Sequence, residues 1–195
     1  AYAFHDCKSL STIEFKEGLR TIDSCAFNGC TKLVNIEFNG GLTTIGEYAF
    51  ENCTGLISVK FPESLTTIAT HGFGYCSALK SVEIPTGMTA INSYVFIGCT
   101  ALKEVILPDT LKTIYAYAFE NSGLESIDIP DSVTTMSARA FYNCTKLTEV
   151  GYPAGWTTTL GYDNDTYYAD GNARYTSPFD GCTSLKEITI DEGVT

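Results

Sequence analysis

The chain is poor in positive charge and has no long apolar segment. Among its 195 residues, 12 Lys and Arg stand against 23 Asp and Glu, which gives a formal net charge of −11 at pH 7. Nucleic acids and anionic membrane surfaces are bound by basic faces, so the charge disfavours both classes of partner. No apolar run approaches the roughly 18 residues that span a bilayer, so we expect no membrane insertion by this segment.

Residues and motifs that commonly carry catalysis or hold metals are also scarce. The chain has only two His, His5 and His71, which lie far apart in the sequence. No stretch matches a nucleophile elbow, a phosphate-binding P-loop or a dinucleotide-binding fingerprint. A zinc site would need clustered ligands, and the C-x₄-C spacing of Cys25 and Cys30 has no matching pair. The sequence therefore predicts no enzyme, no catalytic residues, no metal and no cofactor.

What the chain does contain is a repeat with a period of 23 residues. Phenylalanine marks each unit, at Phe4, Phe27, Phe50, Phe73, Phe96, Phe119, Phe141 and Phe179. The spacing is 23 residues five times, then 22, then 38. The shorter unit reads AFENSGL and places Ser122 near the position of a cysteine, whereas the longer one contains an insertion. A period in this range indicates a repeat architecture.

Each unit has the form A-F-x-x-C-x-x-L-x-x-I-x-[IF]-P-x-x-L-x-x-I-x-x-x, as in AFENCTGLISVKFPESLTTIATH at residues 49–71. The L-x-x-I-x-I part predicts a short strand with alternate residues pointing inward, and the following proline ends the strand pairing because it lacks an N–H. L-T-T-I predicts a second short strand, and A-F-x-x-C a tight turn or a single helical turn. Because one unit buries too little apolar surface alone, the units are predicted to stack around one continuous core.

The motif resembles the BspA-like (Treponema pallidum type) leucine-rich repeat, L-x-x-I-x-L-P-x-x-L-x-x-I-x-x-x-A-F-x-x-C-x-x. The resemblance runs from Ala3 to about Pro153 and resumes from Pro178 to Thr195. It implies an α/β-type repeat protein of mostly short β segments, a right-handed leucine-rich-repeat solenoid with 23-residue units. It also implies a bacterial protein that is secreted or at the cell surface, often an adhesin.

We interpret residues 1–195 as a single repeat domain, interrupted by an insertion at 154–177. Neither end carries the atypical, polar unit that caps a solenoid. We therefore expect the chain to be an excerpt of a longer array.

Seven of the eight cysteines fall three residues after the marker phenylalanine: Cys7, Cys30, Cys53, Cys76, Cys99, Cys144 and Cys182. Stacking would bring neighbouring cysteines about 5 Å apart, within the Cα range of a disulfide. Side chains in a parallel ladder point the same way, however, so we predict a column of buried free thiols. Cys25 lies in a different column with tyrosines, His71 and Arg139, and that mixed composition predicts a partly exposed, more reactive thiol.

The outward positions of the L-x-x-I-x-I strands form one candidate binding surface. The residue between the two inward positions is Glu14, Glu37, Lys60, Glu83, Ile106 and Asp128 in successive units. The column two residues earlier is Thr12, Asn35, Ser58, Ser81, Glu104, Ser126, Glu149 and Glu187. Lys60 is placed to relieve repulsion between its acidic neighbours. This surface is interpreted either as a concave docking site for a protein or glycan, or as a solvated sheet face with no ligand.

Two aromatic groups are further candidates. The insertion holds Trp156, Tyr162, Tyr167, Tyr168 and Tyr175, whose rings offer stiff contact area for a glycan or protein, or merely cover the flank of the interrupted units. Its Asp163, Asp165 and Asp170 resemble a calcium loop only weakly, because the glycine and distal Glu of an EF-hand are missing. Tyr48, Tyr94 and Tyr117 share one column, which is typical of packing between units.

Three functions compete at this stage. The first is an extracellular or cell-surface module for adhesion or binding, with a host or neighbouring-cell protein or glycan as partner. The second is a structural spacer with no ligand of its own. The third is a hydrolase, which would require two sheet-face carboxylates opposite each other in a cleft.

Overall fold

A computed structural model describes residues 1–152 and 177–190 and shows two kinds of short strand alternating along the chain. The longer strands are β2 (Asn35–Glu37), β4 (Ser58–Lys60), β6 (Ser81–Glu83), β8 (Glu104–Ile106), β10 (Ser126–Asp128), β12 (Glu149–Tyr152) and β13 (Glu187–Ile190). The two-residue strands are β1 (Thr21–Ile22), β3 (Thr44–Ile45), β5 (Thr67–Ile68), β7 (Ala90–Ile91), β9 (Thr113–Ile114) and β11 (Thr135–Met136). Both predicted strand segments of the repeat are therefore confirmed.

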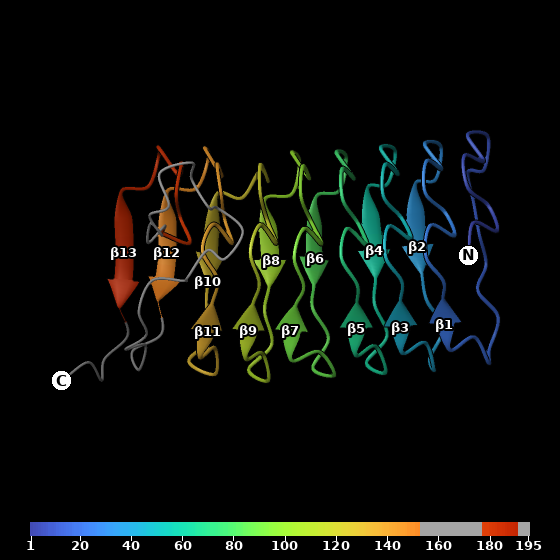
Figure 1. Cartoon of the computed structure of the whole chain (residues 1–195), viewed down its shortest axis with the longest axis horizontal. Helices are drawn as coiled ribbons and strands as arrows, with labels where there is room; N and C mark the ends of the chain where they lie inside the picture. Colours follow the sequence, from blue (N-terminus) through green and yellow to red (C-terminus); the bar gives the residue numbers. More distant parts are fainter. Residues whose placement is uncertain (153–176, 191–195) are drawn as a thin grey trace, which may run out of the picture.

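Strands of the same kind lie side by side and form two rows, which run in opposite directions across the molecule (Figure 1). Pairing within each row is parallel and follows the period of the sequence, with Asn35 opposite Ser58 and Thr44 opposite Thr67. The longer strands form three hydrogen-bonded groups: β2–β4, β6–β8 and β10–β12–β13. The fold is a β-solenoid, as predicted, and the units follow one another from one end of the molecule to the other.

The A-F-x-x-C segments are turns, and the described residues contain no helix, so the helical component of the α/β expectation is not observed there. Within one turn, the Cys53 N–H donates to the Phe50 carbonyl at 3.2 Å. The next unit is joined to it through the Phe50 N–H, which donates to the Gly72 carbonyl at 2.9 Å. These bonds satisfy the backbone polar groups of the turn, which explains how such a turn can lie against a buried core.

Each turn contains backbone in the left-handed region, where side chains are normally disfavoured. The residue before A-F has a φ between 56° and 62° in seven units, at Tyr2, Cys25, Tyr48, His71, Tyr94, Tyr117 and Arg139. A second such position in the turn holds Asp6, Asn52, Tyr75, Asn121 and Asn143, with glycine in other units. The hydrogen bonds between units hold this conformation in place.

The core is built from columns of identical residues. The marker phenylalanine rings stack on one another, with centroids 5.1 to 6.1 Å apart from Phe4 to Phe179. Phe179 stacks on Phe141 at 5.2 Å although 38 residues separate them, and β13 pairs with β12. The repeat therefore resumes in spatial register after the long interval.

The predicted column of buried thiols is confirmed. All eight cysteines are free; Cys30, Cys53, Cys76, Cys99 and Cys144 are buried, and Cys7 and Cys182 are half-buried. From Cys30 onward each thiol in the column donates to the carbonyl of the marker phenylalanine in the preceding unit, at 3.1 to 3.3 Å. Ser122 fills the same slot, is 5% exposed, and lies 3.1 Å from Cys144 Sγ.

The prediction for Cys25 is wrong. This side chain is only 8% exposed, although most members of its column are half-buried or exposed. Cysteine is much smaller than the tyrosine that occupies this position in the units on either side, so its thiol does not reach the surface.

Candidate binding face

The outward positions of the longer strands form one exposed face, which we call the sheet face. Neighbouring units interact across it through their side chains. Lys60 Nζ lies 2.8 Å from Glu37 Oε1, and Ser58 Oγ donates to Asn35 Oδ1 at 2.7 Å. Lys60 thus pairs with Glu37, one of its two acidic neighbours in the column, and this contact raises the pKa of the Lys60 ammonium.

The sheet face is hollowed at two places. The first, which we call the N-terminal hollow, has a volume of about 570 Å³ and is lined by residues from the unit before β2 and from β2 and β4. It brings together six of the predicted positions, which are Glu14, Glu37 and Lys60 of one column and Thr12, Asn35 and Ser58 of the other. Glu14 is also paired with Lys16, so most of the charged side chains around this hollow already form ion pairs with each other or with a neighbouring residue.

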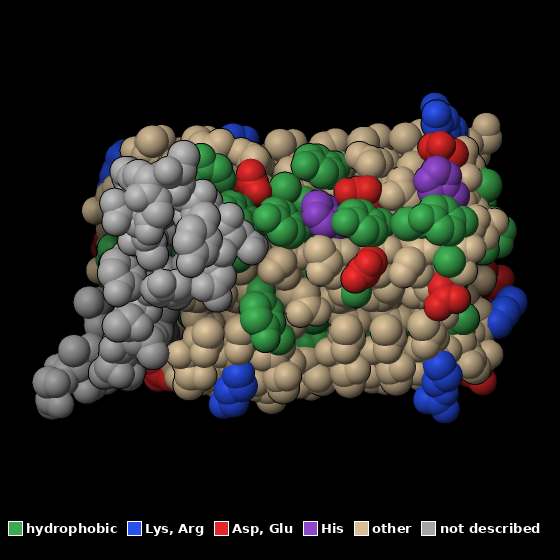
Figure 2. Space-filling view, viewed as in Figure 1, with side chains coloured by type: hydrophobic (Ala, Val, Ile, Leu, Met, Phe, Trp, Pro, Cys, Tyr) green, Lys and Arg blue, Asp and Glu red, His purple; other side chains and the backbone are tan. Residues whose placement is uncertain are grey.

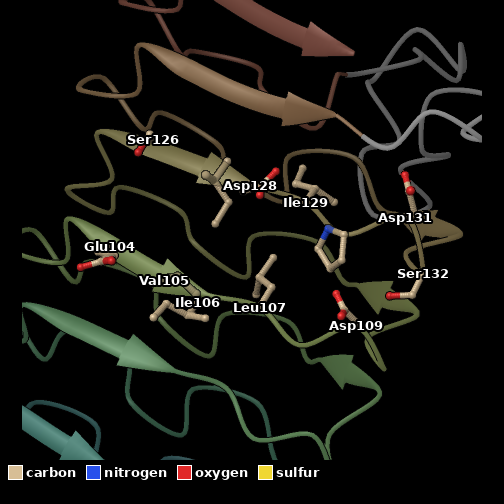
Figure 3. A pocket seen from close by; sticks show the side chains of 12 residues that line it. Glu104, Val105, Ile106, Leu107, Asp109, Ser126, Asp128, Ile129, Asp131 and Ser132 are labelled. Carbon is tan, nitrogen blue, oxygen red and sulfur yellow. The ribbon is translucent and has the colours of Figure 1, made fainter. Parts of the chain in front are cut away.

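The second depression, the β8–β10 groove, has a volume of about 760 Å³ (Figure 3). Glu104 and Ser126 lie near the beginnings of the two strands, while Asp109, Asp131 and Ser132 come from the segments that follow them. The predicted Asp128 lines this groove beside Ile106, which is 51% exposed. Its carboxylate lies over Gly151 on the neighbouring strand, where any side chain would collide with it.

The structure thus places most of the predicted sheet-face residues in one or other of the two depressions. Glu83 lies exposed on β6, between the strands that line the two depressions. Asp109, Asp131 and Ser132 were missed by the sequence reasoning. A signal for the two aspartates was present, because both follow the repeat proline, in the stretches LPDTL and IPDSV.

The candidate residues of the insertion lie outside the described residues: Trp156, Tyr162, Tyr167, Tyr168 and Tyr175, together with Asp163, Asp165 and Asp170. Within the described ranges, no three His, Cys, Asp or Glu side chains are grouped as a metal site would require. The same ranges contain no helix with the length and hydropathy needed to cross a bilayer.

Another part of the surface carries a band of hydrophobic side chains that includes a histidine (Figure 2). Stacked rings of Tyr48, His71, Tyr94 and Tyr117 form what we call the Tyr–His row. His71 stacks between Tyr48 and Tyr94, with ring centroids 4.8 and 4.9 Å apart, and Tyr94 stacks on Tyr117 at 5.0 Å. The expected tyrosine column is therefore continuous, with the histidine as one of its members. Because the rings face one another, they offer edges rather than faces to a ligand, which favours a packing role.

An acidic group approaches this row from the side. His71 Nδ1 lies 3.3 Å from Glu51 Oε1, without the alignment of a hydrogen bond, and both side chains are largely buried. Burial lowers the pKa of His71, and the Glu51 carboxylate acts in the opposite direction. The net direction is downward, so the neutral imidazole is favoured.

Known protein structures share this fold. A leucine-rich repeat protein from Bacteroides ovatus is 26% identical with a TM-score of 0.68, and the match covers 97% of this chain and 57% of that protein. The T. pallidum leucine-rich repeat protein is 26% identical with a TM-score of 0.57, and the match covers 89% of this chain and 65% of that protein. The chain therefore spans less than two thirds of the length of either protein.

A leucine-rich cell surface protein from Faecalibacterium prausnitzii is 21% identical with a TM-score of 0.53, over 98% of this chain and 69% of that protein, which supports the fold alone. No curated protein sequence matches the chain. The family model described as BspA type leucine-rich repeat region matches residues 1–100 and 66–163, most of the chain. This protein therefore belongs to the BspA-type leucine-rich repeat family.

Proposed function

We propose that this protein is an extracellular or cell-surface binding module that recognises a protein or glycan through its sheet face. The observation that carries the proposal is the hollowed sheet face itself. Two depressions of about 570 and 760 Å³ lie on it, and both are lined by outward residues of successive units. Extended surfaces of this kind are the usual recognition surfaces of repeat proteins.

A similar structure supports the proposed surface location. One of the similar structures is named as a leucine-rich cell surface protein. The family match is to a repeat region rather than to a catalytic domain, which is typical of binding or scaffold proteins. The β8–β10 groove is lined by four carboxylates and by no Lys or Arg, which suits the binding of a cationic partner.

A structural spacer is the second candidate, and a specific observation favours it. The stacked phenylalanine column and the thiol-to-carbonyl hydrogen bonds join each unit firmly to the next, as a rigid spacer would require. The binding module and the structural spacer make different predictions, because only a binding module depends on the outward side chains of the sheet face.

The test is a binding screen of the chain against a glycan array and a panel of immobilised extracellular-matrix proteins. The affinity of each hit is then measured for the double variant Glu83→Lys/Asp128→Lys, which reverses two exposed charges of the sheet face. Thr66→Lys, at an exposed position beside the two-residue strands, serves as a control for positive charge added away from the sheet face. We expect a hit whose affinity falls at least about tenfold in the double variant and is unchanged in the control.

Two results would contradict the proposal. A hit that is bound equally by the wild type and the sheet-face variant would remove the sheet face from recognition. Loss of that hit on replacing Trp156 by Ala would then assign recognition to the insertion. If neither screen yields any ligand, the spacer becomes the better account.

A further inference from the structure

The two depressions of the sheet face differ in how far their polar groups are already satisfied. In the N-terminal hollow, Glu37 pairs with Lys60, Glu14 with Lys16, and Ser58 with Asn35. A ligand that binds there must displace or extend existing contacts. In the β8–β10 groove, Glu104, Asp109 and Asp128 are exposed, and no ion pair to any of the three occurs among the described residues.

The β8–β10 groove also has an apolar centre. Ile106 occupies the column in which other units carry Glu14, Glu37, Lys60 or Glu83, yet it is 51% exposed. Leu107 follows it and lines the same groove, half-buried against the core. An isolated exposed isoleucine is ordinary, but this one lies inside a depression with carboxylates around it.

The groove coincides with an irregularity in the solenoid. β8 belongs to one hydrogen-bonded group of strands and β10 to the next. The turn between them is the one that contains Ser122 and lacks one residue of the repeat, so that Phe119 and Phe141 are 22 residues apart. The groove therefore lies at a break in the regular pairing.

On these grounds we propose that the β8–β10 groove is the part of the sheet face that binds the partner. The partner is an extended polypeptide segment carrying Lys or Arg beside an apolar side chain. This inference rests on the proposed function and adds the chemistry of the partner. The groove follows the strands from Glu104 towards Asp109, which suits an extended chain laid along them (Figure 3). Charge complementarity selects a cationic partner over an anionic or neutral glycan.

The side chains of Lys and Arg fit both parts of the groove. Their methylene stems cover apolar surface while the charged end remains near water and carboxylates. Here the stem would lie over Ile106 and the charged end would reach Asp128 or Glu104. The net charge of −11 adds a long-range attraction for the same partner, which is screened by salt.

The experiment uses three fluorescently labelled octapeptides that alternate Lys with Ile, Glu with Ile, and Lys with Ser, with binding followed by fluorescence anisotropy at low and physiological salt. We expect the Lys–Ile peptide to bind most tightly, the Lys–Ser peptide more weakly, and the Glu–Ile peptide least. The variant Glu104→Gln/Asp128→Asn should weaken Lys–Ile binding roughly fivefold. Ile106→Thr should remove the preference of Lys–Ile over Lys–Ser.

The matched control is Glu14→Gln/Glu37→Gln, which removes the same charge from the N-terminal hollow. Equal weakening by the two double variants would overturn the inference, because net charge alone would then explain binding. Equal affinity for the Lys–Ile and Glu–Ile peptides, or no binding of either, would also overturn it. If the peptides fail but a screened ligand still depends on the sheet face, the proposed function survives and only this inference is lost.

Discussion

At the scale of single residues, the cysteines show how a repeat changes the chemistry of a side chain. From Cys30 onward each thiol in the column donates to a carbonyl of the preceding unit, so it behaves as a small apolar group with one satisfied donor. Burial raises the pKa of Cys53 and of Cys99 to about 12. At neutral pH these thiols are protonated, and reaction requires the thiolate.

Thiol labelling tests this assignment. Cys182 is only half-buried, and its interaction with the neighbouring Cys144 lowers the pKa of its thiol. We expect Ellman's reagent to modify the folded protein at Cys182 first, and all eight cysteines only after unfolding. Cys182→Ser should remove the fast phase, whereas Cys25→Ser should leave it unchanged. A fast phase that disappears with Cys25→Ser would show that Cys25 is accessible after all.

At the scale of an element, the turn at each marker phenylalanine forms a part of the surface that the strand pattern of the sequence does not predict. Its first residue adopts a φ near +58° in Tyr48, His71 and Tyr117 alike. Such backbone is costly for bulky side chains and persists only where the surroundings hold it. Here the hydrogen bonds between units and the stacking of the rings supply that support, and the result is the Tyr–His row.

The histidine in this row makes a pH-dependent contribution to stability. Burial lowers the pKa of His71 in the folded protein, while the unfolded chain has an ordinary value of about 6.5. Between these two values the unfolded state binds the proton more readily, so the free energy of unfolding falls as the pH decreases below about 6.5. Above that pH, both states are neutral at this site and the contribution is constant.

His71→Tyr, which repeats the residue of the neighbouring units, should remove this pH dependence. Urea unfolding of both proteins from about pH 8 to about pH 5 gives the comparison. We expect the stability of the wild type relative to His71→Tyr to decrease as the medium is acidified. Glu51→Gln should steepen the decrease, because it removes the carboxylate that favours the charged imidazole. If the difference in unfolding free energy between the wild type and His71→Tyr did not change with pH, His71 would not be the source of the pH dependence.

At the scale of the whole molecule, each unit contacts mainly its neighbours, so local defects are expected to remain local. The most informative position is the last described unit, residues 177–190, which follows the long interval in the repeat. Arg139 reaches across to it: Nε lies 3.2 Å from Asp180 Oδ2, while Nη1 donates to Tyr117 Oη at 3.0 Å. The guanidinium also lies 5.3 Å from the centre of the Tyr142 ring.

We expect Asp180→Asn to loosen this unit without unfolding the others. Loss of the ion pair to a largely buried Arg should weaken local protection by about 1 kcal/mol, so amide exchange in β13 should accelerate about fivefold. Exchange in β4 and β6 should be unchanged. Lys60→Gln, which removes an ion pair between two exposed side chains, is the control and should alter no segment measurably. Uniform acceleration along the chain would show that the units unfold together.

The sequence by itself determined the architecture, because a spacing of 23 residues forces equivalent side chains into the same column. From that spacing alone follow the stacked phenylalanines, the buried thiols, the acceptance of Ser122 in a cysteine slot, and the pairing of Lys60 with Glu37. These are contacts between equivalent positions of adjacent units, which a repeat specifies completely.

Only the tertiary structure decided what happens between columns. The burial of Cys25 depends on the size of its neighbours, and the approach of Glu51 to His71 depends on the shape of the turn. The β8–β10 groove arises where two groups of strands meet and gathers Asp109 and Asp131 from the segments after the strands. Glu51 and His71 occupy different columns, and the size of neighbouring side chains and the breaks in strand pairing vary from unit to unit, so the period alone does not specify these features.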